Sequence, residues 1–182
     1  MKDFNFDQLR SDIVAAAKEA FSEIAAQRPS DDLCAFALYS DSGAMTVCPA
    51  MCTTGFLATK AQEKPGEYLF YKYSPSEWPL EGVGAGVAIG KICKSLRDHL
   101  EIIEGDYEAF QSFQRRLMET CVQAQEQLRK TFFATRSNDF LLLVTISDDD
   151  EPAAELQARM DRLNSPHISA EFAGWVRTWG SY

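Results

Sequence analysis

The sequence has little histidine, which limits the kinds of catalysis open to it. Only His99 and His167 occur among its 182 residues. A serine or cysteine nucleophile usually needs a neighbouring base such as histidine, so a catalytic triad has few candidates. We interpret His99 as part of a solvated helical face and His167 as a loop residue after Pro166.

Cysteine is also sparse, and an odd count does not suggest a secreted disulfide scaffold. Cys48 and Cys52 stand four residues apart, but no second cysteine or histidine pair follows at zinc-binding spacing. We therefore predict no metal and no cofactor, and expect the cysteines to act as small buried apolar residues. The five cysteines are Cys34, Cys48, Cys52, Cys93 and Cys121.

Long apolar runs and a surplus of basic residues are both missing. No run approaches the roughly 20 apolar residues of a membrane span, and the first residues lack the apolar stretch of a signal peptide. With 18 basic and 27 acidic residues, the net charge is -9. This charge disfavours nucleic acids and anionic membranes. We expect a cytoplasmic protein that attracts a basic protein partner, or one that is acidic simply to stay soluble.

Length and composition indicate one globular domain over residues 1–182. This length suits one domain, and 46% hydrophobic with 25% charged residues is typical of a folded protein. Apolar periodicity predicts both helices and strands along the chain. The predicted helices are 6–24 with Asn5 as cap, 53–61, 87–103, 107–133, 151–163 with Asp150 as cap, and 172–179. The predicted strands are 33–40, 44–51, 68–73 and 140–146.

These elements predict an α+β fold. We expect a small, mostly antiparallel sheet with amphipathic helices packed on it. The helices at 87–103 and 107–133 are expected to form a central αα-hairpin. Pro49 suggests that its strand lies at an edge or ends there.

The glycine-rich segment Gly82–Gly90 does not fit a phosphate loop. In a dinucleotide fingerprint the third glycine position falls on Val87 or Ile89. The P-loop pattern fails too, because isoleucine follows Lys91. We expect these glycines to let a helix lie close to its neighbour.

An acidic run at the end of a predicted strand is the first candidate site, formed by Asp148, Asp149, Asp150 and Glu151. Such carboxylates can bind Mg²⁺ or Ca²⁺ or meet a cationic partner. The alternative is a turn and a helix N-terminus, where acidic side chains are favoured.

An aromatic cluster is the second candidate: Tyr68, Phe70, Tyr71, Tyr73 and Trp78. An exposed cluster of this kind is typical of a protein interface, but strands prefer aromatic residues for packing reasons alone. We predict that a partner binds Glu77 and Trp78 together with the acidic run.

Several short motifs occur in an order that resembles a known family. They are Ala35–Asp41, Tyr73–Trp78, Ile146–Asp148 and Arg162–Asn164. Their order resembles the bacterial domain of unknown function 4303 family over about residues 6–164. The resemblance implies an immunity protein, because members look like accessory proteins encoded near polymorphic-toxin genes. It carries over no catalytic residues, and this chain departs from the pattern by a helical insert at about 87–133 and a tryptophan-rich tail.

Three hypotheses follow. The first is an immunity protein that binds a cognate basic toxin and occludes its active site. The second is an enzyme with a carboxylate- or metal-centred site near Asp148. The third is a non-catalytic adaptor that binds through Trp78 or the helix around Trp175 and Trp179.

Overall fold

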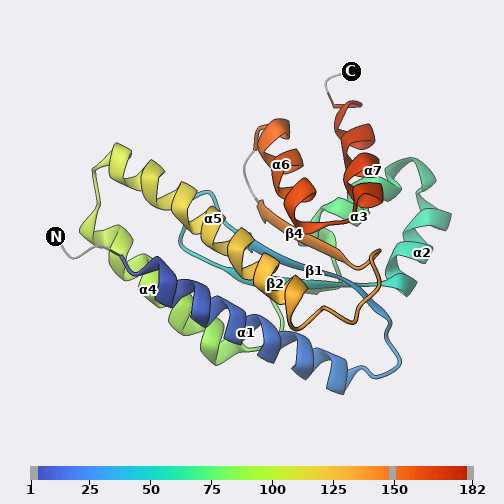
Figure 1. Ribbon diagram of the computed structural model, residues 1–182, viewed down its shortest axis with the longest axis horizontal. Helices are drawn as coiled ribbons and strands as arrows, with labels where there is room; N and C mark the ends of the chain where they lie inside the picture. The colour runs from blue at the N-terminus through green and yellow to red at the C-terminus, as the bar shows by residue number, and fades with distance from the viewer. Residues whose placement is uncertain (1–3, 148–150, 180–182) are drawn as a thin grey trace.

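A four-stranded mixed sheet lies between helices on both of its faces (Figure 1). The computed structural model describes residues 4–147 and 151–179. Strand β1 (Leu33–Ser40) is antiparallel to β2 (Cys48–Thr53) and parallel to β4 (Leu141–Ile146). The short β3 (Leu80–Glu81) pairs with β2, which gives the order β3-β2-β1-β4. The predicted α+β class with a mostly antiparallel sheet is confirmed.

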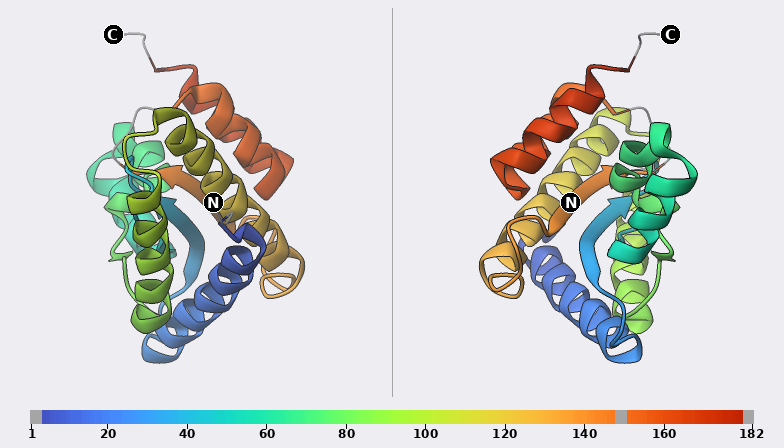
Figure 2. Two further views of the ribbon diagram at one scale, coloured as in Figure 1. Left: turned by 90° about the vertical axis from the view of Figure 1, so that its left-hand side faces the viewer. Right: turned by 90° about the vertical axis from the view of Figure 1, so that its right-hand side faces the viewer.

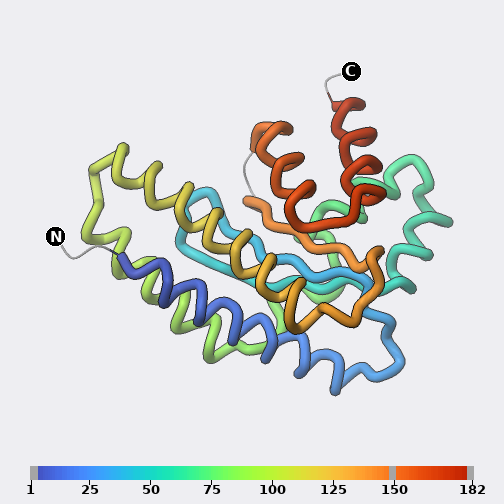
Figure 3. The backbone as a smooth tube through the Cα atoms, viewed as in Figure 1, coloured from blue at the N-terminus to red at the C-terminus, as the bar shows by residue number. Residues whose placement is uncertain are grey.

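Three long helices cover one face of the sheet: α1 (Phe6–Gln27), α4 (Gly86–Ile102) and α5 (Tyr107–Lys130). They share a core with every second residue of β1, including Phe36. Helices α4 and α5 follow one another across a short turn, as the predicted αα-hairpin requires, and α1 packs against both. The backbone tube in Figure 3 shows this turn close to the start of α1.

Shorter helices cover the other face: α2 (Thr54–Glu63), α3 (Tyr68–Tyr73), α6 (Ala153–Leu163) and α7 (Pro166–Val176). Two 3₁₀ turns, Pro65–Glu67 and Pro75–Glu77, flank α3. Small residues of β1 and β2 on this face, such as Ala37 and Ala50, leave room for the helices. The side views in Figure 2 show the strands in the middle of the molecule with helices around them.

The aromatic segment predicted as a strand is a helix instead. Residues 68–73 form α3, which turns Tyr71 and Tyr73 inward. The Tyr71 ring meets Phe56 edge-on and lies 4.8 Å from the Lys60 ammonium nitrogen. These contacts with α2 outweigh the strand preference of aromatic residues, which depends strongly on context.

The second strand begins at Cys48 and not at Ala44. The Asp41 carboxylate accepts hydrogen bonds from the Met45 amide and the Thr46 hydroxyl, and these bonds prolong the turn. Ala44 itself takes a left-handed φ of 55°. The strand continues past Pro49 and pairs on both sides at its next residues, so that proline marks neither an edge nor an end.

Both helices near the C-terminus differ from their predicted bounds. Helix α6 begins at Ala153 with Pro152 at its N-cap position, whereas the predicted cap, Asp150, lies outside the described residues. Helix α7 begins earlier than predicted, because the Ser165 side chain caps it, and ends at Val176.

Both histidines lie elsewhere than predicted. His167 belongs to the first turn of α7 and not to a loop. His99 is half-buried between the rings of Phe4 and Phe113, at 5.0 and 4.9 Å between centroids. This burial lowers the pKa of His99, so it does not belong to a solvated face.

The glycine-rich segment has the predicted packing role at one position. Gly84 has a φ of +87°, and a Cβ there would lie 2.8 Å from the Cα of Ala20 on α1. The neighbouring Ala85 amide donates to the Glu23 carboxylate at 2.9 Å. The entry to α4 therefore lies directly against α1.

Within the described ranges, the helices are too short or too polar for any of them to cross a bilayer.

Candidate partner-binding site

The residues predicted to bind a partner differ in how accessible they are. Asp148, Asp149 and Asp150 lie outside the described residues. Glu77 is exposed at the end of a 3₁₀ turn. Trp78 is only 3% exposed, and its indole N–H donates to a backbone carbonyl at 3.0 Å. In this fold a partner can reach Glu77 but not the Trp78 ring.

Glu151 also points inward. Its side chain is 4% exposed and accepts hydrogen bonds from the Ile146 amide, at 2.7 Å, and from the Arg159 guanidinium. The carboxylate therefore ties the end of β4 to α6. Where the chain is described, no group of three or more His, Cys, Asp or Glu residues is placed to hold a metal.

A cavity of about 620 Å³ lies beside this ion pair, between β4, α3, α6 and α7. Its wall includes Trp175 and Trp179, the residues of the adaptor hypothesis. Their rings meet edge-on at 4.9 Å. The two charged residues that line it, Glu151 and Arg159, pair with each other. The cavity thus offers apolar surface with no free charge.

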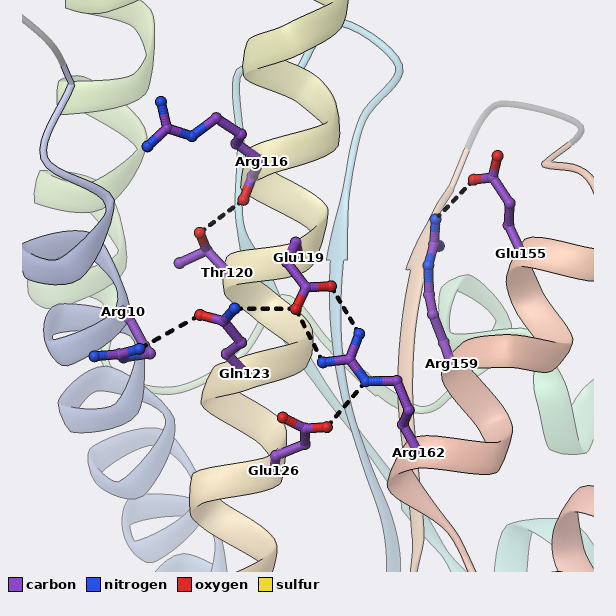
Figure 4. Close-up of polar contacts among 9 residues, drawn as sticks. All are labelled: Arg10, Arg116, Glu119, Thr120, Gln123, Glu126, Glu155, Arg159 and Arg162. Carbon is purple, nitrogen blue, oxygen red and sulfur yellow. Dashed lines mark hydrogen bonds and ion pairs between the residues drawn. The ribbon is translucent and has the colours of Figure 1, made fainter.

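An ionic seam joins α5 to α6 (Figure 4). Arg162 donates to the carboxylates of Glu119, at 2.7 and 2.9 Å, and of Glu126, at 2.9 Å. Hydrogen bonds from Arg162 lower the pKa of Glu119. Gln123 donates to Glu119 and accepts from Arg10, which extends the seam to α1. Because these carboxylates are already paired, they add little attraction for a basic partner.

The turn between α4 and α5 carries acidic residues of a different kind. Residues 97–108 contain five acidic residues and one basic residue. Asp98 pairs with Lys94, and Asp106 caps α5. In the described part of the chain, no side chain pairs with the remaining three. These three are Glu101, Glu104 and Glu108, and all are exposed.

Glu101 and Glu104 line an apolar groove of about 580 Å³, which we call the tip groove, and so does the exposed Arg97. Its more buried lining comes from Leu100, Ile103 and Phe110, and Met45 lines it from the β1–β2 turn. Two apolar side chains of the lining are exposed, Tyr107 to 70% and Met45 to 46%. Exposed apolar surface with a polar rim is typical of an interaction site.

Hydrogen bonds hold the walls of the tip groove in place. Gln114 of α5 donates to the Ser42 carbonyl at 2.9 Å and docks the β1–β2 turn onto α5. Gln111 donates to the Tyr107 hydroxyl at 2.8 Å. Side chains fixed in this way lose less entropy when a partner binds.

The sequence contained a signal for this site that we did not single out as a candidate. Residues 101–108 read EIIEGDYE, where acidic residues flank Ile102 and Tyr107 around the predicted turn. Apolar residues at the end of an αα-hairpin, outside the faces that pack, tend to remain exposed. Acidic residues on both sides of them then form a rim.

Comparison with known families gives one match. Residues 13–165 match the family described as Domain of unknown function (DUF4303). No curated protein and no solved structure matches the chain. The matched span contains the four strands of the sheet, the part of the ionic seam that joins α5 to α6, and the tip groove. The chain therefore belongs to the domain of unknown function 4303 family.

Proposed function

We propose that this chain is an immunity-type protein that binds a cognate basic toxin through the tip groove and occludes the toxin's active site. The observation that carries this proposal is the groove itself, an apolar surface whose lining has three acidic residues and one basic residue, Arg97. Among the described residues, Glu101 and Glu104 form no ion pair, so the groove carries a net negative charge. The basic character of the partner comes from this charge. The choice of a toxin comes from the family resemblance.

The side chains at the tip suit such a partner. Tyr107 supplies an exposed aromatic ring, the residue type that often dominates interface energetics, and Met45 supplies apolar area in the same groove. The unpaired carboxylates of Glu101 and Glu104 on the rim attract a basic surface from a distance and speed its arrival. Affinity would come from the apolar centre and the association rate from the rim.

A toxicity rescue tests the biological role. The gene adjacent to this one is expressed in a bacterial host with and without this chain, and survivors are counted. We expect the neighbour to kill alone, the chain to rescue the host, and the two proteins to copurify. A harmless neighbour, or equal killing in both cases, would remove the main support for a toxin. Copurification with a non-toxic protein would favour the adaptor hypothesis.

Charge reversal tests the surface. Glu101→Lys with Glu104→Lys should slow association with the copurified partner by about tenfold at low salt. The difference should shrink as ionic strength rises, because salt screens exposed charges. Glu19→Lys with Asp139→Lys is the matched control, with the same change of net charge at exposed positions away from the tip. Equal slowing in both would assign the effect to net charge and not to the groove.

Truncation of the aromatic anchor tests the apolar centre. Tyr107→Ala should weaken binding by about thirtyfold, mainly through faster dissociation. Phe70→Ala is a suitable control, because Phe70 is an exposed aromatic residue on α3, on the other face of the sheet. A loss of affinity in Phe70→Ala but not in Tyr107→Ala would place the interface elsewhere.

A further inference from the structure

A β-bulge brings two cysteines together on one face of the sheet. Leu33 pairs with Thr53 and Ala35 pairs with Cys52, so Cys34 is the extra residue in β1. Strand residues normally alternate between faces, but a bulge interrupts that alternation and redirects a side chain. Cys34, Ala35 and Cys52 all pack in the core on the α6–α7 side.

The two cysteines are close enough to interact directly. The Cys34 thiol donates to the Cys52 carbonyl at 3.5 Å, and the Cys52 thiol donates to the Thr53 carbonyl at 3.8 Å. Ala35, the chain neighbour of Cys34, is the residue directly opposite Cys52. The bulge therefore places Cys34 beside Cys52 on the same face of the sheet.

Only one of the pair is open to solvent. Cys34 is half-buried and lines a pocket of about 360 Å³ together with Thr54, Tyr68 and Lys72. Cys52 is buried beneath it. A small reagent can therefore reach the Cys34 sulfur from the pocket, whereas Cys52 is shielded from solvent.

Hydrogen bonding favours the thiolate on the accessible sulfur. The Cys52 thiol lowers the pKa of Cys34, although burial opposes it, and the Thr54 hydroxyl adds to the lowering. The same hydrogen bond, with burial, raises the pKa of Cys52. Thiolate character and access are what make a cysteine reactive, and oxidation-sensitive cysteines often have a second cysteine beside them.

We propose that Cys34 and Cys52 are a peroxide-oxidised pair that closes to a reversible disulfide, with Cys34 as the thiol that reacts first. The Cys34 thiolate attacks one oxygen of a peroxide, so an S–O bond forms, the O–O bond breaks, and the leaving oxygen takes a proton. Cys34 becomes a sulfenic acid. The Cys52 sulfur then attacks it, an S–S bond forms, and hydroxide leaves with the Cys52 proton as water. A dithiol reverses the reaction by exchange.

The other half-buried cysteine provides a comparison within the same chain. Cys48 is exposed to a similar degree, but burial raises its pKa. It lies at the other end of β2, opposite Tyr39 and not opposite Cys34. We expect Cys48 to stay reduced when Cys34 is oxidised.

Peroxide treatment of the full-length folded chain, followed by intact-mass measurement and peptide mapping, tests this proposal. We expect the loss of two hydrogens, a cross-link between Cys34 and Cys52, and full reversal by dithiothreitol. In Cys52→Ser, dimedone should trap a sulfenic acid at Cys34. Cys48→Ser, the matched control, should form the same cross-link as the natural chain.

A second measurement needs no substitution and so does not depend on how a variant folds. Under native conditions, iodoacetamide should modify Cys34 at least about tenfold faster than Cys48. Equal or reversed rates would overturn the proposal. An unchanged mass at peroxide concentrations that consume free cysteine, or a cross-link between other cysteines, would also overturn it.

Discussion

Replacing Glu151 by glutamine tests whether its buried carboxylate holds α6 to the end of β4. Glu151 accepts one hydrogen bond from the Ile146 amide and another from Arg159, whose side chain is itself mostly buried. Removing one partner from a buried ion pair leaves the other charge without compensation and costs about 3–5 kcal/mol. Glutamine keeps an oxygen for the Ile146 amide, and Arg159 retains Glu155 at 3.5 Å.

We therefore expect Glu151→Gln to lower the free energy of unfolding by about 3 kcal/mol, at the lower end of the range for a broken buried ion pair. For a chain of this size, that corresponds to a decrease in Tm of roughly 6–12 °C. Urea unfolding followed by far-UV circular dichroism measures the loss. The slope of the transition should stay unchanged if the variant keeps the same folded and unfolded states.

The matched control is Glu155→Gln, which removes a carboxylate that contacts the same arginine. Glu155 is 63% exposed, and exposed ion pairs of this kind contribute about 0–1 kcal/mol. If the two variants unfold at the same urea concentration, the Glu151–Arg159 pair contributes no more than a surface contact. The carboxylate would then be free to serve a partner, as the sequence suggested.

Two further predictions concern single positions. Gly84→Ala should destabilise the fold by about 2–4 kcal/mol, because the left-handed backbone disfavours a side chain and the new Cβ meets Ala20. Gly82→Ala has the same backbone strain, but a Cβ there meets no neighbouring atom. A thermal melt should therefore show a loss of stability of only about 1–2 kcal/mol. Equal losses in the two variants would contradict a clash between residue 84 and Ala20. Glu119 has a pKa below its ordinary value of 4.5 because Arg162 donates to it. Its contribution to stability is therefore present above that value and lost as pH falls through the lowered pKa. In urea titrations across acidic pH, Glu119→Gln should flatten this part of the stability curve, and an unchanged curve would refute the assignment.

The sequence predicted correctly those helices and strands whose structure depends on residues close together in the chain. The first helix begins after Asn5, whose side chain accepts from the Gln8 amide at 3.0 Å, and this bond depends on residues three positions apart. Strands β1 and β4 also fall within one residue of their predicted bounds. In each case the spacing of the apolar residues and the polar residues on either side predict the same type of element and the same ends.

Elements that depend on distant contacts were not predictable in the same way. The aromatic segment 68–73 has a strong strand preference, but it forms a helix that packs against α2 and α7. The Tyr73 hydroxyl donates to the Glu171 carboxylate of α7 at 2.6 Å. That hydrogen bond joins residues 98 positions apart. No local pattern in the sequence indicates such a partner.

In the candidate site, too, the sequence showed which charges are adjacent but not which ones form ion pairs with distant residues. The run from Asp148 to Glu151 attracted attention because its charges are adjacent in sequence. Adjacency does not indicate which charges find partners: Glu151 is bound by an arginine eight residues away. The acidic residues of the tip are interrupted by apolar ones, so they did not stand out as a charged run. The fold leaves Glu101 and Glu104 exposed in the lining of one groove.

The charged residues behind the net charge of -9 therefore fall into two groups, those in ion pairs and those exposed without one, and substitutions in the two groups should have different effects. Charges in the seam, such as Glu119 and Arg162, hold helices together, so changing them alters folding and surface charge at once. Glu101 and Glu104 are exposed, and among the described residues neither forms an ion pair. Reversing them changes surface charge near both Asp106 and Arg97, so the free energy of unfolding should stay within about 0.5 kcal/mol of the natural chain. If the tip groove binds a partner as proposed, variants there should change binding and leave stability nearly unchanged, so the site can be tested separately from the fold.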